Sequence, residues 1–323
     1  MLSHSSEKMV SLVCLLLVSF LLLSKTIALN PNITKKNINS DVKLIYHMGP
    51  VISPDITVHI VWYGAWKPAH KRIIREFINS FSAPIRRSPS VSDWWKVVQL
   101  YTDQTGSNIS RTVTLGQEKN DRLLSQGRML TRLSVQLVIK AAIEAKKNPL
   151  PAQSMGGLYL VLTSDEIQVQ DFCVIACGFH YFTFPSIVGY TLPYAWVGNS
   201  ERMCPGLCAY PFAVPDYARG AVKPLKSPNS EVGVDAMISV IAHEMAEMAT
   251  DPLINAWYAG SEPADPVEIA DLCIGRYGGG GGSGYVGEVR RDANGAAFNV
   301  YGIRRRFLIQ WIWSYVADNC VGP

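Results

Sequence analysis

The sequence predicts an α/β or α+β fold, a single layered domain in which helices flank a mixed sheet and disulfides staple the loops. Two observations predict the layers. Residues 56–63 (ITVHIVWY) and 158–163 (LYLVLT) are runs of β-branched, aromatic and aliphatic residues that are typical of buried strands. The segments between them carry apolar residues at helical spacing. Strands and helices that follow one another in this way pack as layers around one core.

The N-terminal residues 1–28 are expected to be a signal peptide. Their apolar run, residues 10–23, is too short and too interrupted to span a membrane, and small residues offer a cleavage site near Ala28. A loose leader (29–41) and one domain (42–323) follow. No later segment has the roughly 20 uninterrupted apolar residues of a spanning helix. We therefore expect a protein without a transmembrane segment, secreted to the extracellular space or apoplast.

Two helices are predicted between the two strands. The first covers residues 68–81, with Pro68 in its first turn and apolar residues at helical spacing. The second covers residues 123–147 and ends before Pro149. Both helices would lie against the sheet.

The rest of the chain is predicted to be less regular. Residues 172–230 contain four cysteines and many prolines without a helical period, which favours irregular strands and loops. The glycine-rich segment 278–284 is typical of a flexible loop and lacks the lysine of a P-loop. Alternation within residues 301–315 predicts a closing strand.

Cysteine usage agrees with secretion. The sequence has seven cysteines, of which Cys14 leaves with the signal peptide. Six thiols in an oxidising compartment can form three disulfides. A zinc knot is the alternative for the two Cys-x3-Cys pairs, but the usual paired histidine spacing is absent, so we favour disulfides. The candidate cysteines are Cys173, Cys177, Cys204, Cys208, Cys273 and Cys320.

Surface chemistry gives weaker signals. Two sequons, at Asn32 and Asn108, are candidate glycosylation sites. The formal charge is +4, and a few short basic clusters do not form a nucleic-acid motif, so no nucleic-acid partner is expected. Cell-wall polysaccharide is a candidate partner, because exposed tryptophans can stack on sugar rings, although tryptophans near strands more often belong to the core. The tryptophans considered are Trp62, Trp66, Trp94 and Trp95.

The best-defined helix is residues 234–250 (VDAMISVIAHEMAEMAT). At about 100° per residue, its large apolar side chains form one stripe, and small and polar side chains form the other face. A freely solvated face would carry mixed long charged residues. The small residues around His243 and Glu247 therefore predict close approach of another layer or of a ligand.

His243 and Glu247 are one helical turn apart, a rise of about 6 Å, so both side chains can bind one divalent metal ion, with zinc the candidate cofactor. Glu268 and Asp271 are the candidates for a third ligand. Glu244 is the candidate general base, as in zinc hydrolases of the His-Glu-x-x-His type, although here Glu247 replaces the second histidine. The alternative is a hydrogen-bonded His243–Glu247 pair inside a packed helix.

Other catalytic interpretations have less support. His47, His59 and His180 lie in or near strands and are interpreted as structural. Paired cysteines exclude a thiol nucleophile, and no Gly-x-Ser-x-Gly elbow occurs. Asp251 lies eight residues after His243, about 12 Å along the helix, and is assigned to helix termination before Pro252.

Several long motifs resemble one family. They are YHMGPVISPDITVHIVWYGAWKPAHKRII, SVSDWWKVVQLYTDQTG, DPLINAWYAG, EIADLC and GGGGGSGY. They are similar to the plant EXORDIUM-like, or phosphate-induced protein 1, family over about residues 42–320. The namesake members lack the His-Glu-x-x-Glu string, so the chain resembles a subgroup that carries it.

The resemblance implies a secreted protein of the cell wall and apoplast that is linked to brassinosteroid-dependent growth and cell expansion. It implies no established chemical activity. Three hypotheses therefore remain: a growth-associated extracellular protein, a zinc-dependent hydrolase that uses the helix around His243, and a non-catalytic polysaccharide-binding module.

Overall fold

The computed structural model describes residues 43–218, 220–263, 266–282 and 284–323. The predicted signal peptide (1–28), the leader (29–41) and the sequon at Asn32 lie outside the described residues. Within the described part of the chain, no helix has the length and apolar character needed to cross a membrane.

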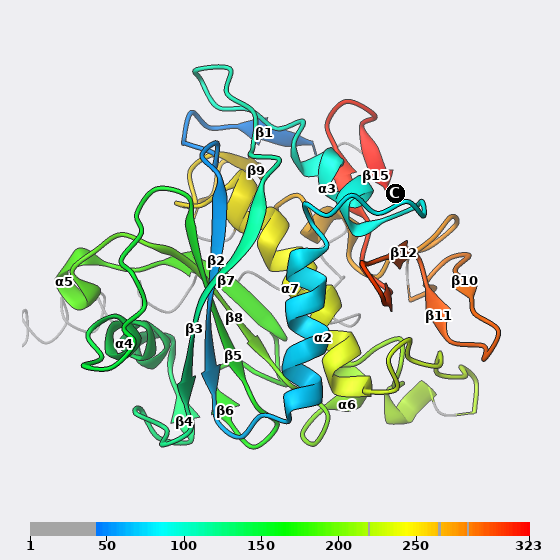
Figure 1. The fold of residues 1–323 in the computed structure, drawn as a ribbon. Helices are drawn as coiled ribbons and strands as arrows, with labels where there is room; N and C mark the ends of the chain where they lie inside the picture. The colour runs from blue at the N-terminus through cyan, green and yellow to red at the C-terminus, as the bar shows by residue number, and fades with distance from the viewer. Residues whose placement is uncertain (1–42, 219, 264–265, 283) are drawn as a thin grey trace, which may run out of the picture.

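A five-stranded sheet forms the centre of the fold, with the strand order β3-β2-β5-β8-β7 (Figure 1). Its strands are β2 (Ile56–Tyr63), β3 (Val113–Asp121), β5 (Gly157–Thr163), β7 (Gly178–Phe182) and β8 (Pro193–Gly198). Four strands are parallel, and β7 runs antiparallel to β8 at one edge. Strands β2 and β5 are covered on both faces, which explains their continuous apolar sequences. The predicted mixed sheet is confirmed.

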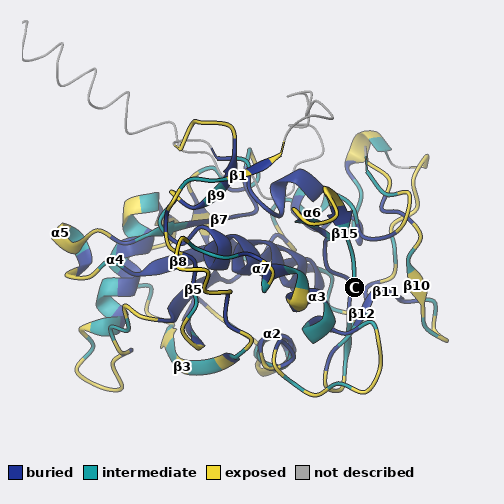
Figure 2. Cartoon of the chain, turned by 90° about the horizontal axis from the view of Figure 1, so that it is seen from above, coloured by how far each residue is buried: buried dark blue, intermediate teal, exposed yellow. Residues whose placement is uncertain are grey.

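Helices cover both faces of this sheet (Figure 2). On one side lie α2 (Pro68–Asn79), α3 (Val91–Val98) and α7 (Val232–Thr250), and on the other lies α4 (Arg132–Ile143). Helix α7 packs between the sheet strands β7 and β8 and the helices α2 and α3. Residues 233–250 are therefore all buried. The close approach of another layer predicted for the small, polar face of this helix is confirmed, because neither face meets solvent.

The sheet is doubly wound. Strands β2 and β5 are neighbours in the sheet. The chain continues from β2 to β3 toward one edge of the sheet, and from β5 to β8 toward the other edge. The loops after β2 and β5 therefore diverge at the carboxyl edge of the sheet. In open parallel sheets, this is where a crevice for ligands forms.

The remaining elements are short. Two-stranded ladders pair β1 (Leu44–Tyr46) with β9 (Trp257–Ala259), β4 (Met129–Leu130) with β6 (Gln168–Val169), β10 (Arg290–Arg291) with β11 (Ala297–Phe298), β12 (Val300–Tyr301) with β13 (Arg306–Phe307), and β14 (Ile312–Ser314) with β15 (Asn319–Val321). Single helical turns are α5 (Pro185–Val188), α6 (Pro205–Cys208), η1 (Asp216–Ala218) and η2 (Asp271–Cys273).

Three disulfides are present, as predicted. Cys173–Cys204 and Cys177–Cys208 cross-link the same two segments, each with a sequence separation of 31 residues. Cys273–Cys320 ties η2 to the C-terminal hairpin, with a separation of 47 residues. The zinc-knot alternative for the Cys-x3-Cys pairs is thereby excluded.

The predicted helix over 123–147 is wrong at both ends, because α4 covers only Arg132–Ile143. Residues 129–130 form strand β4, and Gly127 has a positive φ of 77°, which breaks the helical path. The helix begins only at Arg132, after Thr131, whose side chain accepts a hydrogen bond from the Ser134 backbone N–H.

Three further parts of the chain differ from the sequence predictions. Helix α3 was not predicted, although Ser90 and Asp93 form a capping box at its start. The single closing strand predicted over 301–315 is divided into parts of three short strands. The irregular middle segment was predicted too broadly, because it supplies β7 and β8 to the central sheet.

Three of the tryptophans considered for sugar stacking belong to the core. Trp62, Trp94 and Trp95 are each 0% exposed. The indole N–H of Trp94 donates to the Gln310 carbonyl and that of Trp95 to the Ser110 carbonyl. A polysaccharide cannot reach these rings, and only Trp66 is partly accessible.

Candidate metal centre

Helix α7 places three ionisable side chains, His243, Glu244 and Glu247, in the interior of the protein. The helix ends at Asp251, whose Oδ1 accepts hydrogen bonds from the backbone N–H groups of Asn255 and Ala256. The predicted role of Asp251 as a helix terminator is confirmed.

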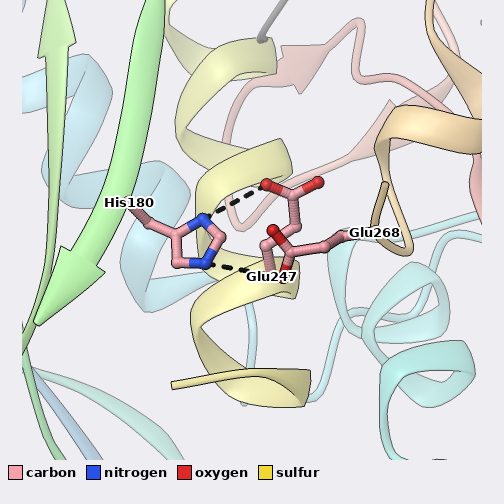
Figure 3. Close-up of side chains that lie close together, drawn as sticks. All are labelled: His180, Glu247 and Glu268. Atoms are coloured by element: carbon pink, nitrogen blue, oxygen red, sulfur yellow. Dashed lines mark ion pairs between the residues drawn. The ribbon is translucent and has the colours of Figure 1, made fainter. Parts of the chain in front are cut away.

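His180 reaches the same region from strand β7. Its Nδ1 lies 3.5 Å from Glu244 Oε2 and 3.3 Å from Glu247 Oε2. Its Nε2 lies 3.5 Å from Glu268 Oε1. In Figure 3, dashed lines join the two ring nitrogens of His180 to the carboxylates of Glu247 and Glu268, which lie on the same side of the ring. The interpretation of His180 as only a structural neighbour of aromatic residues is therefore wrong, since its ring faces three carboxylates.

Strand β7 can approach α7 this closely because residue 178 is glycine. A Cβ on Gly178 would lie 2.7 Å from Val240 Cγ1 and 2.8 Å from Glu244 Oε1. Either contact is too short for a real side chain, so an alanine there would push the strand from the helix. The His180 ring depends on this approach, two residues further along the strand.

His243 belongs to a second group on the opposite side of Glu247. Its Nε2 lies 3.1 Å from Glu247 Oε1 and 3.4 Å from Asp271 Oδ1. The His243–Glu247 pair considered as the structural alternative is therefore present, but it is part of a larger cluster. Glu247 contacts one histidine with each of its two carboxylate oxygens.

The acidic segment that contains Glu268 and Asp271 is fixed in three ways. Asp271 Oδ2 accepts a hydrogen bond from the Glu268 backbone N–H at 3.1 Å, which leaves Oδ1 toward His243. The Trp313 backbone N–H donates to the Ile269 carbonyl at 2.8 Å. The disulfide at Cys273 anchors the end of the segment, as the sequence predicted. Both carboxylates are thus placed by rigid neighbours.

The side-chain amide of Gln310 orients the imidazole ring of His243. Its Oε1 lies 3.5 Å from His243 Nδ1, and its Nε2 donates to the Ala270 carbonyl. This orientation of the amide presents an acceptor to His243, so Nδ1 carries the proton and Nε2 is left toward Glu247 and Asp271. Metal-binding histidines are commonly oriented by such an acceptor.

The cluster contains buried polar atoms without hydrogen-bond partners among the described residues. They are both ring nitrogens of His180, both oxygens of Glu244, Glu247 and Glu268, and Oδ1 of Asp271. An unpaired buried polar group costs about 1–3 kcal/mol, and more if it is charged. Several of these atoms form the ion pairs at 3.1–3.5 Å described above, and they lie close enough together to hold a metal ion.

The carboxylates strongly perturb one another. Burial would lower the pKa of His180 and His243, but the neighbouring carboxylates outweigh it and raise both pKa values well above the usual range. Burial raises the pKa of Glu244, Glu268 and Asp271, that of Asp271 to about 7.

The pKa of Glu247 is shifted in the opposite direction. Burial would raise its pKa, but the two histidines outweigh burial and lower the pKa to about 2. Glu247 is therefore the carboxylate that stays ionised at the centre of the cluster.

The geometry suits metal ligands as well as ion pairs. Two ligand atoms, each about 2.0–2.1 Å from a tetrahedral zinc ion, are roughly 3.3 Å apart. The nitrogen–oxygen separations in the cluster range from 3.1 to 3.5 Å. Two sets of three residues can each direct one ligand atom to within 4.8 Å of the others: His180, Glu247 and Glu268, and His243, Glu247 and Asp271.

The structure therefore brings together all five residues proposed from the sequence and adds His180. A signal for His180 existed, because a lone histidine in a strand with aromatic neighbours on both sides is expensive to bury without a partner. The sequence alone could not identify the partners of His180, because β7 contacts α7 only in the folded chain.

Comparisons with known proteins indicate one family. The family described as "phosphate-induced protein 1 conserved region" matches residues 44–323. Protein EXORDIUM-like 3 of Arabidopsis thaliana is 65% identical over 282 residues, 87% of this chain and 83% of that protein. Protein PHOSPHATE-INDUCED 1 of Nicotiana tabacum is 35% identical over 285 residues, 86% of this chain and 87% of that protein. No solved structure matches the chain.

Proposed function

Because the chain belongs to the phosphate-induced protein 1, or EXORDIUM-like, family, we propose that it is a secreted protein of the cell wall and apoplast that acts in brassinosteroid-dependent growth and cell expansion. The signal-like segment 1–28 and three disulfides support secretion. The exposed side chain of Asn108 supports glycosylation.

At the molecular level, we propose that the protein binds divalent metal, zinc in the first place, at the buried cluster on α7. The observation that carries this proposal is the set of orphaned nitrogen and oxygen atoms on His180, Glu244, Glu247, Glu268 and Asp271. Bound metal ions would satisfy these atoms and offset the buried negative charge.

The test uses protein secreted by plant cells. Mass spectrometry should give an N-terminus near Leu29 and six oxidised cysteines, and elemental analysis should give at least one divalent ion per chain. Glu247→Gln keeps the side-chain shape but removes the central ligand charge, so it should lose the metal. Glu144→Gln, on an exposed side chain, is the matched control and should retain it. Metal-free wild-type protein would contradict the proposal.

The growth role is tested by complementation. Plants that lack this protein should recover brassinosteroid-dependent growth with the wild-type chain and with Glu144→Gln. If the metal centre carries the activity, Glu247→Gln should fail to restore growth at equal protein abundance in the wall. Full restoration by Glu247→Gln would separate metal binding from growth.

A hydrolase is a second candidate, favoured by the position of Glu244. Its carboxylate lies in the cluster, and burial raises its pKa, as suits a general base. The closed site opposes this function, because His243, Glu244 and Glu247 are at most 1% exposed and a hydrolase needs an open metal position. Glu244→Gln should keep the metal and abolish hydrolysis of wall esters, peptides or glycosides; unchanged hydrolysis would exclude Glu244 as the base.

Polysaccharide binding is favoured by a different place in the fold. A cavity of about 150 Å³ opens at the carboxyl ends of β2, β5 and β8, where the doubly wound sheet diverges. It is lined by residues that include Trp66, Lys67, His70, Asp165, Asn199 and Arg202. An aromatic ring beside carboxylate and amide groups is the composition that recognises a sugar.

Trp66→Ala should weaken binding to wall oligosaccharides about tenfold, an effect of about 1.4 kcal/mol. The loss is expected because Trp66 is the only tryptophan, tyrosine or phenylalanine among the lining residues. Isothermal titration with pectin and cellulose fragments measures it. Tyr285→Ala removes an aromatic ring that is 57% exposed elsewhere and serves as the control. Equal affinities for wild type and Trp66→Ala would exclude this cavity.

A further inference from the structure

The two possible ligand sets share one residue, Glu247. Its Oε2 faces His180 at 3.3 Å, and its Oε1 faces His243 at 3.1 Å. The two histidines therefore approach different oxygens of the same carboxylate. A carboxylate used in this way has the arrangement of a bridge between two metal ions.

We propose that the cluster is a dinuclear centre. One divalent ion is held by His180, Glu247 and Glu268, and the other by His243, Glu247 and Asp271, with Glu247 as the bridge. This inference rests on the proposed metal binding and specifies its stoichiometry. Two ions in such centres lie about 3.5–4 Å apart, a separation that one bridging carboxylate can span.

The contacts divide in the same way. The ion-pair contacts of His180 reach Glu244, Glu247 and Glu268, whereas those of His243 reach Glu247 and Asp271. A single ion at either position would satisfy one histidine and leave the other among unpaired carboxylates. Two ions satisfy both sets.

The charge of the buried carboxylates also supports two metal ions. Five buried carboxylates lie in or beside the cluster and together carry five negative charges when ionised: Glu244, Glu247, Asp251, Glu268 and Asp271. Two divalent ions carry four positive charges, and metal-binding histidines are neutral. Two ions would therefore leave one negative charge in the buried centre, whereas a single ion would leave three, which is more costly.

Each position offers one imidazole and two carboxylates. Imidazole suits zinc and iron, and carboxylate suits manganese and magnesium, so the mixed set selects zinc, manganese or iron(II) rather than a soft-metal site. The ring nitrogens of His243 also suit one of the two positions. In His243, Nδ1 faces Gln310 and Nε2 faces the ligand carboxylates, which leaves Nε2 to bind the metal.

The experiment counts ions in the full secreted chain, unfolded in urea with its disulfides intact and refolded with zinc. Elemental analysis should give two zinc ions per wild-type chain and two for the control Glu144→Gln. Glu268→Gln and Asp271→Asn should each retain about one ion, because each removes a ligand from one position only. Glu247→Gln should retain none. Circular dichroism checks that each variant folds.

A second measurement does not depend on variants. Wild-type protein refolded with manganese should lack the six-line electron paramagnetic resonance signal of isolated Mn²⁺, because the bridge couples the two ions. A single ion per wild-type chain, or an uncoupled six-line signal at full loading, would overturn the dinuclear centre and leave metal binding intact. A chain without metal would overturn both proposals.

Discussion

Protein refolded with zinc is expected to melt about 10 °C higher than protein refolded with a chelator. An ion that binds only the folded state stabilises it by about 4 kcal/mol when its free concentration is a thousand times its dissociation constant. In a domain of this size, each kcal/mol raises the melting temperature by roughly 2–4 °C. Differential scanning calorimetry measures both samples.

The matched comparison is Glu247→Gln, which loses the central ligand at nearly constant volume. Its melting temperature should not respond to zinc, whereas that of Glu144→Gln should respond as the wild type does. If zinc raised the melting temperature of Glu247→Gln as much as that of the wild type, the ion would be bound elsewhere.

Removing the Cys273–Cys320 disulfide by a double change to alanine should lower the free energy of unfolding by about 4 kcal/mol. Its sequence separation is 47 residues, and the entropy of closing such a loop gives a loss of this size. The same disulfide anchors the segment that carries Glu268 and Asp271, so zinc affinity should fall as well. Urea unfolding followed by tryptophan fluorescence measures the first effect and zinc titration the second.

The other disulfides supply the control. Cys173–Cys204 and Cys177–Cys208 close loops of equal length that are shifted by four residues. When one of the pair is removed, the other still closes nearly the same loop. Cys173→Ala with Cys204→Ala should therefore cost less than about 1 kcal/mol. Equal losses for the two double variants would show that loop closure does not set these stabilities.

Local patterns predicted the parts of the fold that depend on near neighbours. The apolar runs of β2 and β5 and the proline that begins α2 are such patterns, and the structure contains each element. The position of α7 followed from its length and periodicity. Glu268 and Asp271 were proposed as the nearest acidic candidates for a third ligand, and the structure places Asp271 against His243 and Glu268 against His180.

The errors have physical causes. Leu123 and Leu124 continue the apolar spacing of the following helix, but the turn at Gly127 and the pairing of β4 with β6 prevent helix formation there. Helix α3 is only eight residues long, too short for a periodic signal. His180 lies 67 positions before Glu247, so only the tertiary packing of β7 on α7 could reveal that they face each other.

The complete enclosure of α7 has a further consequence for the timing of metal uptake. A closed interior exchanges ions with solvent only when the surrounding layers open, and such opening in a stable core is as rare as global unfolding. An ion would therefore enter while the chain folds and leave only when it unfolds. The metal content of the mature protein should then record the ions available in the compartment where the chain folded, whatever the composition of the fluid it later meets.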